Sequence, residues 1–187
     1  MILPIYLYGQ PVLRQEAEDV PENYPDLKKL VADMYETMHE SEGVGLAAPQ
    51  VGLSIRLIVI DADVLKDTFP ELAGVQLTLV NPELDIYTDA PKVTRSEGCL
   101  SLPGMSEPVV RHEKVHLNWL DENFVEHDQV FEGYLARIIQ HEYDHLDGML
   151  YVDRISPIRK QLIKSKLNNI VRGRIRCDYK IKETRKH

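Results

Sequence analysis

The residues best suited to chemistry form one short motif, His141-Glu142-Tyr143-Asp144-His145. Two histidines four residues apart lie on the same face of a helix, so both imidazoles can reach one metal ion. Glu142 follows the first histidine at a different helical angle, where it can stand beside the metal without binding it. A general base for an activated water has to occupy such a position. The motif therefore predicts a metal-dependent hydrolytic site, although five residues can also match this pattern by chance.

Two histidines do not complete such a site, because catalytic zinc is usually held by three protein ligands with one position left for water. In thermolysin-like proteases the third ligand is a downstream glutamate, and in metzincin proteases it is a histidine three residues after a glycine. Here the downstream acids are Asp147, Asp153, Asp178 and Glu183; the first is too close to the motif, and the last two lie in the basic tail. Tyr151 stands where the metzincin histidine would be. The usual protease completions therefore fail.

Cys99 offers a different third ligand, in a segment flanked by Gly98 and Pro103. A thiolate binds divalent transition metals strongly, and its charge partly neutralises the ion. A lone cysteine is more often a small buried hydrophobic residue. Beside an incomplete two-histidine site, we favour the ligand.

A third segment, residues 43–52, is rich in glycine and alanine and contains Gln50. Small residues let a peptide backbone approach closely, and the Gln50 amide could face a carbonyl oxygen. Taken alone, such a segment indicates only a tight turn after a helix.

Together and in this order, the three segments resemble the motifs of the peptide deformylase family. Residues 43–50 read Gly-Val-Gly-Leu-Ala-Ala-Pro-Gln and match Gly-x-Gly-x-Ala-Ala-x-Gln. Residues 97–101 match Glu-Gly-Cys-Leu-Ser, and residues 140–145 match Gln-His-Glu-x-Asp-His. By motif order and spacing, the resemblance covers roughly residues 5–155.

The resemblance implies an α+β fold, with antiparallel sheets packed around a central helix that carries the His-Glu-x-x-His motif, and a C-terminal helix. It implies a metal-dependent hydrolase that removes the N-formyl group from the N-terminal formyl-methionine of newly synthesised polypeptides and releases formate. The implied roles are metal ligation by Cys99, His141 and His145, acid/base catalysis by Glu142, and oxyanion contacts from the Gln50 side chain and the Leu100 backbone N–H.

We expect the substrate to pair with Gly45 and its neighbours as an added strand. Val44, Tyr134 and Ile139 are candidate walls for the methionine side chain. Family members commonly have apolar residues just before the last motif, where this chain has Tyr134 and Arg137. The side-chain preference at the pocket rim is therefore open. Glu97 is expected to be structural and paired with an arginine.

One cysteine and two histidines suit zinc, iron, cobalt or nickel. The resemblance implies Fe(II) as the native ion, readily exchanged for the others. Two other interpretations stay open. One is a zinc peptidase of another lineage that shares only His-Glu-x-x-His. The other is a non-enzymatic structural site, which a fourth protein ligand would usually close.

Apolar periodicity predicts the elements that must position these motifs. Helices are expected over residues 25–40 and 133–146, the second with Gly148 as its C-cap, and over residues 156–173, beginning with a serine N-cap. Strands are expected over residues 56–61 and 76–81, the latter stopped by Pro82, and in a hairpin of residues 115–120 and 124–131. Strands followed by helices favour an α+β domain.

The bulk composition is that of an ordinary globular enzyme. A chain of 187 residues, 43% hydrophobic and 28% charged, suits one domain with a substantial core. It contains no apolar run long enough for a transmembrane helix. The N-terminal residues suggest a strand rather than a signal peptide, and two cysteines do not suggest a secreted disulfide scaffold. We therefore expect a cytoplasmic enzyme with no membrane partner.

The net charge of −8 conceals an asymmetry. Residues 1–153 hold 10 basic and 28 acidic residues, whereas residues 154–187 hold 12 basic and 2 acidic residues. We divide the chain into a catalytic domain over residues 1–155 and a C-terminal helix with a basic tail over residues 156–187. A basic end on an acidic body is typical of contact with a polyanion.

A nascent-chain substrate suggests which polyanion this is. We hypothesise that residues from about Arg159 onward contact the ribosome, whose surface is rich in RNA phosphate. In the alternative, the helix packs on the domain through Ile158, Leu162 and Ile163, and the tail is disordered.

Overall fold

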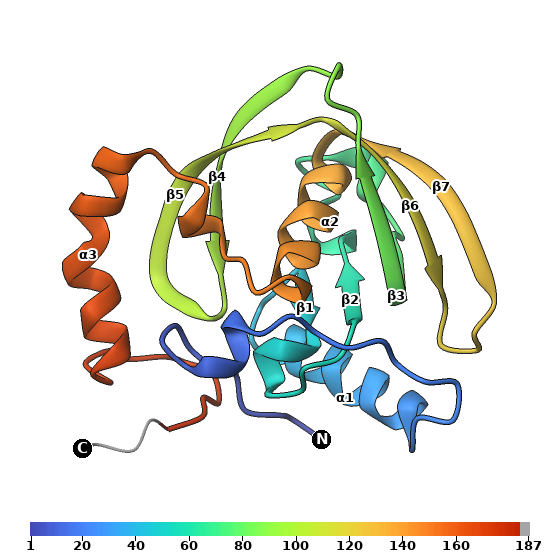
Figure 1. Ribbon diagram of the computed structural model, residues 1–187, viewed down its shortest axis with the longest axis horizontal. Helices are drawn as coiled ribbons and strands as arrows, with labels where there is room; N and C mark the ends of the chain where they lie inside the picture. Colours follow the sequence, from blue (N-terminus) through green and yellow to red (C-terminus); the bar gives the residue numbers. More distant parts are fainter. Residues whose placement is uncertain (184–187) are drawn as a thin grey trace.

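The computed structural model describes residues 1–183, and within them three α-helices and seven strands form an α+β fold (Figure 1). The helices are α1 (Leu27–Glu40), α2 (Gly133–Leu146) and α3 (Pro157–Val171). The strands are β1 (Gly45–Ala47), β2 (Leu57–Asp61), β3 (Gln76–Ile86), β4 (Lys92–Cys99), β5 (Leu102–His112), β6 (Lys114–Leu120) and β7 (Glu126–Glu132). Short 3-10 helices lie in the connections, at Pro11–Arg14, Ala48–Val51, Asp63–Leu65, Pro70–Leu72 and Tyr151–Asp153.

The strands form two antiparallel sheets. One has five strands in the order β1-β2-β3-β6-β7, and the other is the β4–β5 hairpin. Figure 1 shows α2 in the centre of the molecule, with the hairpin on one side and the larger sheet on the other. The predicted arrangement of antiparallel sheets around the motif-bearing helix is confirmed.

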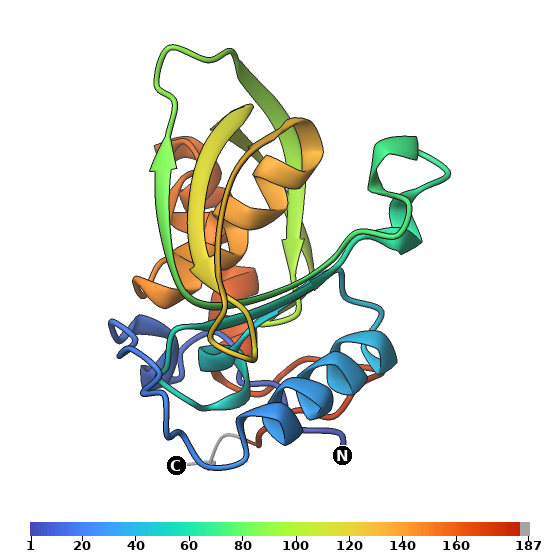
Figure 2. The same ribbon diagram turned by 90° about the vertical axis from the view of Figure 1, so that its right-hand side faces the viewer.

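Strand β2 is buried on both faces because a helix covers each side of the large sheet (Figure 2). Leu57 and Val59 belong to the apolar cluster that contains α1 residues, whereas Ile58 and Ile60 belong to the cluster that contains α2 residues. Alternate residues of a strand point to opposite faces, so one run of apolar residues serves both clusters. This packing fixes α2 against the sheet.

Helix α2 ends where the sequence predicts. Gly148 has a φ of +71°, a left-handed conformation that favours glycine. The N–H of Met149 donates to the carbonyl of Asp144 at 2.9 Å, which satisfies a carbonyl of the last helical turn. A Cβ at Gly148 would lie 2.7 Å from the Arg14 carbonyl oxygen, so the glycine is also required by close packing.

Strand β3 is longer than predicted. Pro82 does not end it, and the strand continues to Ile86. The pairing with β6 shifts register between Val80 and Glu83, and such a bulge accommodates a proline that cannot donate a ladder hydrogen bond. Asn81 in this bulge exchanges two side-chain hydrogen bonds with the backbone of Val20, at 2.7 and 3.0 Å.

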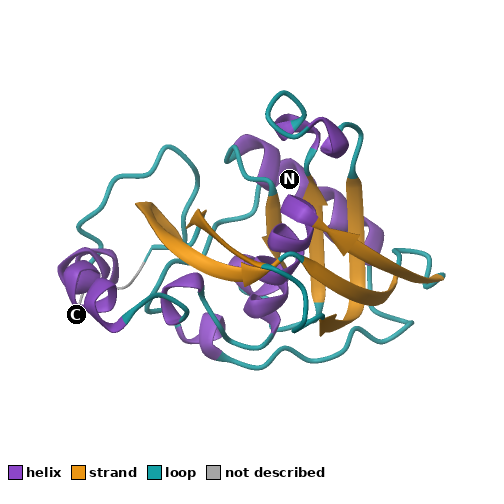
Figure 3. Cartoon of the chain, turned by 90° about the horizontal axis from the view of Figure 1, so that it is seen from above, coloured by secondary structure: helices purple, strands orange, loops and turns teal. Residues whose placement is uncertain are grey.

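Helix α3 begins as predicted, with the Ser156 hydroxyl accepting from the N–H of Arg159 at 3.3 Å. Its packing differs from the predicted apolar stripe. Ile163 is buried, but Ile158 and Leu162 are 73% and 63% exposed. Figure 3 shows the helix at one end of the molecule, away from the five-stranded sheet. Only part of the stripe therefore holds the helix in place.

The chain beyond α3 folds back onto the body. The N–H of Ile5 donates to the Lys180 carbonyl at 2.9 Å, and the N–H of Lys182 donates to the Ile5 carbonyl at 2.8 Å. These bonds make a parallel bridge between Ile5 and Ile181. The alternative of a disordered tail is therefore wrong for residues 174–183, and the last four residues lie outside the described part of the chain.

No helix within residues 1–183 is both long enough and apolar enough to cross a lipid bilayer.

Candidate active site

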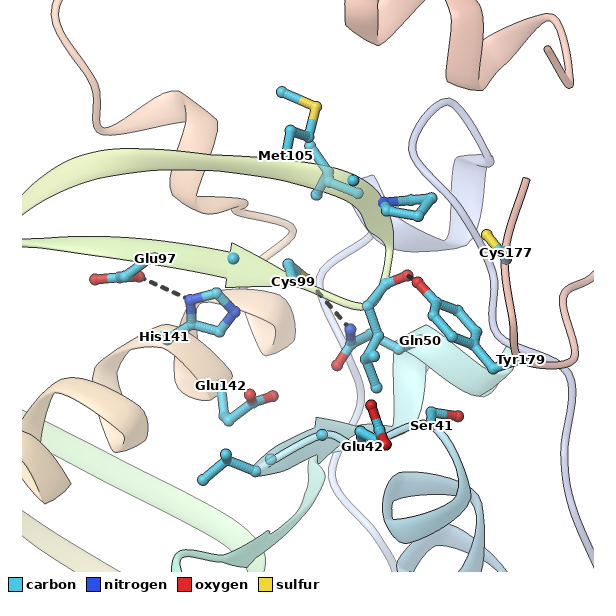
Figure 4. A pocket seen from close by; sticks show the side chains of 18 of the residues that line it. Ser41, Glu42, Gln50, Glu97, Cys99, Met105, His141, Glu142, Cys177 and Tyr179 are labelled. Carbon is cyan, nitrogen blue, oxygen red and sulfur yellow. Dashed lines mark hydrogen bonds and ion pairs between the residues drawn. The ribbon is translucent and has the colours of Figure 1, made fainter. Parts of the chain in front are cut away.

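A cleft of about 750 Å³ lies between β1 with its preceding loop and the turn that joins β4 to β5 (Figure 4). Residues of α2 line its interior, and residues 176–179 of the C-terminal segment line another part of it. All three predicted motif segments therefore contribute to one cleft.

The structure brings the three candidate metal ligands together. Cys99 comes from the end of β4, and His141 and His145 come from successive turns of α2. One donor atom from each lies within 4.8 Å of the other two, and Cys99 Sγ is 3.5 Å from His145 Nε2. The pairing of β4 with β5 shifts register between Gly98 and Cys99, at the end of β4 that carries the thiol. Three soft or borderline donors at this spacing fit one transition-metal ion.

Glu97 orients the first histidine. His141 Nδ1 lies 2.7 Å from Glu97 Oε1, which leaves Nε2 as the nitrogen available to a metal ion. Burial would raise the pKa of Glu97, but hydrogen bonds with His141 and Arg111 outweigh it and lower the pKa to about 2. The carboxylate therefore stays ionised and can hold the ring as a donor on Nδ1.

Arginines surround Glu97 in a buried network. Arg111 makes two hydrogen bonds to this carboxylate, at 2.6 and 2.9 Å, and a third at 3.0 Å to Asp144 on α2. Arg137 also pairs with Glu97 and donates to the Val109 carbonyl at 3.0 Å. The expected pairing of Glu97 with an arginine is confirmed. Arg137 also lines the cleft, but its guanidinium is held inside this network.

Glu142 is buried beside the candidate metal group and has a free oxygen. Its side chain is among the buried groups at 5% exposure, and its Oε2 lacks a hydrogen-bond partner among the described residues. Burial raises the pKa of Glu142 to about 7. A Cβ at Gly45 would lie 2.6 Å from Glu142 Oε1, so glycine is needed there to admit the carboxylate. A carboxyl group in this state can take up and return a proton near neutral pH.

Gln50 and the Cys99–Ser101 turn form the opposite wall. The Gln50 Oε1 accepts from the Ala47 N–H at 3.0 Å, which directs its Nε2 toward the turn. That nitrogen donates to Ser101 Oγ at 3.1 Å and lies 3.4 Å from Cys99 Sγ. Leu100, in the middle of the turn, also lines the cleft. The amide of Gln50 and the turn are thus fixed relative to each other.

The predicted substrate walls are only partly where the sequence places them. Val44, Gly45 and Tyr134 line the cleft. Ile139 does not, because it is fully buried in the apolar cluster behind α2. Ile138, one residue earlier on the helix, lines the cleft instead. Adjacent helical residues point about 100° apart, so a one-residue error exchanges a cleft position for a core position.

The sequence interpretation missed the C-terminal lining of the cleft. Arg176, Cys177, Asp178 and Tyr179 all face it, and Tyr179 is hydrogen-bonded to Leu100. No motif marks these residues, and the only signal in this region was its positive charge.

Fold and site together fit the class of α+β metal-dependent hydrolases, with the candidate general base and candidate metal ligands on one central helix and one hairpin. The family model described as Polypeptide deformylase matches residues 2–161. The chain belongs to the peptide deformylase family, whose members remove the N-formyl group from newly made polypeptides.

Known members are similar over nearly the whole chain. The peptide deformylase of Flavobacterium psychrophilum is 44% identical, with 97% of each chain covered, and that of Cytophaga hutchinsonii is 43% identical, also with 97% of each covered. The crystal structure of peptide deformylase from Thermus thermophilus has a TM-score of 0.81 at 40% identity. That match covers 92% of this chain and 99% of that one.

Proposed function

We propose that this chain hydrolyses the formyl group of N-terminal formyl-methionine through the group formed by Glu142 and the candidate ligands Cys99, His141 and His145. The main support is a buried carboxyl oxygen of Glu142, next to these three donors. It has no hydrogen-bond partner among the described residues. A purely structural metal site has no use for such an oxygen, and burying it unpaired costs stability. Its presence favours a catalytic site.

Cys99, His141 and His145 would hold one divalent ion, with Fe(II) as the native ion and zinc, nickel or cobalt as alternatives. Such an ion lowers the pKa of a water that it binds and polarises a carbonyl oxygen. The donor set supports this assignment, because the Glu97 carboxylate fixes the tautomer of His141.

Glu142 takes a proton from the attacking water as the new carbon–oxygen bond forms. It then donates that proton to the methionine nitrogen as the bond between this nitrogen and the formyl carbon breaks. Formate and a free N-terminus are released. The Gln50 Nε2 and the Leu100 N–H stabilise the negative charge that develops on the formyl oxygen.

The peptide would bind as an added strand along β1, at Gly45 and its neighbours. Strand β1 stands at one end of the five-stranded sheet, so one of its edges is available for pairing. Backbone pairing tolerates many sequences, whereas a side-chain pocket selects the first residue. Val44, Tyr134 and Ile138 are the candidate walls of that pocket.

A matched pair of peptides tests this function. Formyl-Met-Ala-Ser should yield formate and Met-Ala-Ser, and Met-Ala-Ser itself should remain intact. A zinc peptidase of another lineage would instead cleave peptide bonds in the unformylated peptide. Cleavage of either peptide without release of formate would contradict the proposal.

Air should distinguish iron from nickel in this site. Fe(II) and a half-buried Cys99 thiolate are both open to oxidation, so the iron form should lose activity in air much faster than the nickel form. Activity is followed over time for protein loaded anaerobically with each metal. Equal lifetimes for the two forms would contradict Fe(II) as an oxidation-sensitive native ion.

We further propose that the enzyme works in the cytoplasm and contacts the ribosome through α3. Lys160, Lys164 and Lys166 are exposed on this helix, as are the apolar side chains of Ile158 and Leu162. Arg159 is less available, because it pairs with Glu107 at 2.6 Å. The exposed lysines and apolar side chains together suit a surface of RNA phosphate and protein.

Charge reversal tests this contact better than truncation, because a truncation would also remove residues that line the cleft. Changing Lys160, Lys164 and Lys166 to glutamate should weaken ribosome binding and make it less sensitive to salt. Turnover of a free formyl tripeptide should stay unchanged.

The matched control reverses three exposed lysines elsewhere, Lys28, Lys66 and Lys92, and gives the same net charge. Ribosome affinities are compared by co-sedimentation over a range of salt concentrations. Equal affinities for the two triple variants would remove the support for docking through α3.

A further inference from the structure

The C-terminal segment, residues 174–183, lies beyond the match to the family model and forms part of the cleft. Figure 4 shows Cys177 and Tyr179 among the lining residues, on the far side of Gln50 from His141. The contacts of this segment in the cleft point to a role in the reaction.

The direct contact is made by Tyr179. Its hydroxyl donates to the Leu100 carbonyl oxygen at 2.6 Å. Burial raises the pKa of Tyr179, so the hydroxyl keeps its proton and remains a donor. Leu100 is the residue whose N–H is proposed to contact the formyl oxygen.

The turn is held from three directions. Tyr179 binds the carbonyl of Leu100, and the N–H of Tyr8 donates to the carbonyl of Ser101 at 2.8 Å. On the cleft side, Gln50 Nε2 donates to the Ser101 hydroxyl at 3.1 Å. Without Tyr179, the carbonyl of Leu100 would lose this anchor while its neighbour Ser101 kept both of its own.

The position of Tyr179 is itself fixed by the pairing of the two chain ends. The backbone bonds from Ile5 to Lys180 and Lys182 hold the residues that directly follow Tyr179. The same N-terminal segment contacts the other proposed oxyanion donor, because the N–H of Tyr6 donates to the Gln50 carbonyl at 2.7 Å. Both donors are therefore tied to one layer formed by the N- and C-terminal segments.

From these contacts we infer that Tyr179 is a positioning residue. It fixes the carbonyl of the Leu100–Ser101 peptide and so restricts rotation about the Leu100 backbone, which keeps the N–H of the preceding Cys99–Leu100 peptide directed toward the formyl oxygen. The inference rests on the proposed deformylase mechanism. Donors of this kind accelerate a reaction because they are already oriented before charge develops. A turn that moves more freely has to be ordered in the transition state, which lowers kcat more than it changes substrate binding.

The test replaces Tyr179 by phenylalanine, which keeps the ring and removes the hydroxyl. We expect kcat for formyl-Met-Ala-Ser to fall on the order of tenfold, less than the 10²–10³ for losing a whole oxyanion donor. KM and metal content should stay close to those of the unmodified protein. Backbone amides of residues 99–102 should exchange with deuterium faster.

Tyr35→Phe is the matched control, because the Tyr35 hydroxyl on α1 donates to the Leu77 carbonyl of β3 at 2.8 Å. Neither residue is among those that line the cleft. Both substitutions should lower the midpoint temperature of unfolding. Only Tyr179→Phe should change kcat and the rate of amide hydrogen–deuterium exchange in residues 99–102.

Unchanged kcat and unchanged exchange in Tyr179→Phe would overturn the inference, and so would a kcat loss explained entirely by lost metal. If the unmodified protein released no formate, the proposed function would fail instead. The exchange measurement would then still decide whether Tyr179 orders the turn.

Discussion

Replacing Glu142 by glutamine is expected to lower kcat for a formyl tripeptide by about 10²–10⁴, the usual range for losing a general acid–base. The substitution keeps the shape of a side chain that packs against Gly45, so the fold should be retained. It removes the ability to accept a proton from water and to return it to the leaving nitrogen. Metal content should stay stoichiometric, because Glu142 is outside the group of three donors.

Glu132→Gln is a suitable control for this substitution, since Glu132 is an exposed carboxyl immediately before the same helix. It should change neither the rate nor the metal content. Metal analysis and steady-state formate release on both variants give the comparison. Loss of metal from a folded Glu142→Gln protein would show that Glu142 is a ligand, and the assigned role would be wrong.

Replacing Cys99 by alanine should abolish metal binding and activity together. Two imidazoles would remain, without the thiolate that completes the set and partly neutralises the ion. Changes to groups that merely orient a ligand cost about 10–100-fold in metal affinity or activity. Losing a ligand should therefore cost more than that, and the purified variant should contain little metal.

The second cysteine supplies the control. Cys177 is also half-buried and lines the same cleft, but it is not in the group of three donors. Cys177→Ala should retain one ion per chain, as measured by elemental analysis of protein purified without air. A stoichiometric, active ion in the Cys99→Ala protein would refute the ligand assignment.

The central helix and the grouping of its ligands could be predicted from sequence because their signals are local. Helical spacing places His141 and His145 on one face, and a glycine at the C-cap marks the end of the helix. Cys99 followed as the third donor because two histidines leave such a site incomplete, and the resemblance to the family implies the same ligand. These signals do not give the rotation of the helix about its own axis. That rotation decides that Ile138, and not Ile139, faces the cleft.

The β4–β5 hairpin could not be predicted, since its buried positions do not show the usual alternation of apolar residues. Glu97, Glu107 and Arg111 are buried there, and each is charged. They are tolerated because Arg111 pairs with Glu97, and Arg159 of α3 pairs with Glu107. Both partners of the Arg111–Glu97 pair are buried, so removing either one would leave an unpaired buried charge and strongly destabilise the hairpin.

The position of the C-terminal segment was also beyond the reach of sequence patterns. The pairing of Ile5 with Ile181 is a single bridge between distant parts of the chain. A bridge that pairs only one residue with one other leaves no periodic pattern in the sequence. The positive charge of the region suggested a solvated tail, whereas its half-buried residues, including Tyr179, place it against the body.

Formate release measured against metal occupancy tests the central claim most directly. The protein is purified without air, stripped of metal and reloaded with Fe(II) to a series of occupancies, and each sample is assayed with formyl-Met-Ala-Ser. We predict that formate and free amine appear in equal amounts, at a rate proportional to occupancy and close to zero in the stripped protein. Equal formate release by stripped and loaded protein, or no formate from fully loaded protein, would contradict the account.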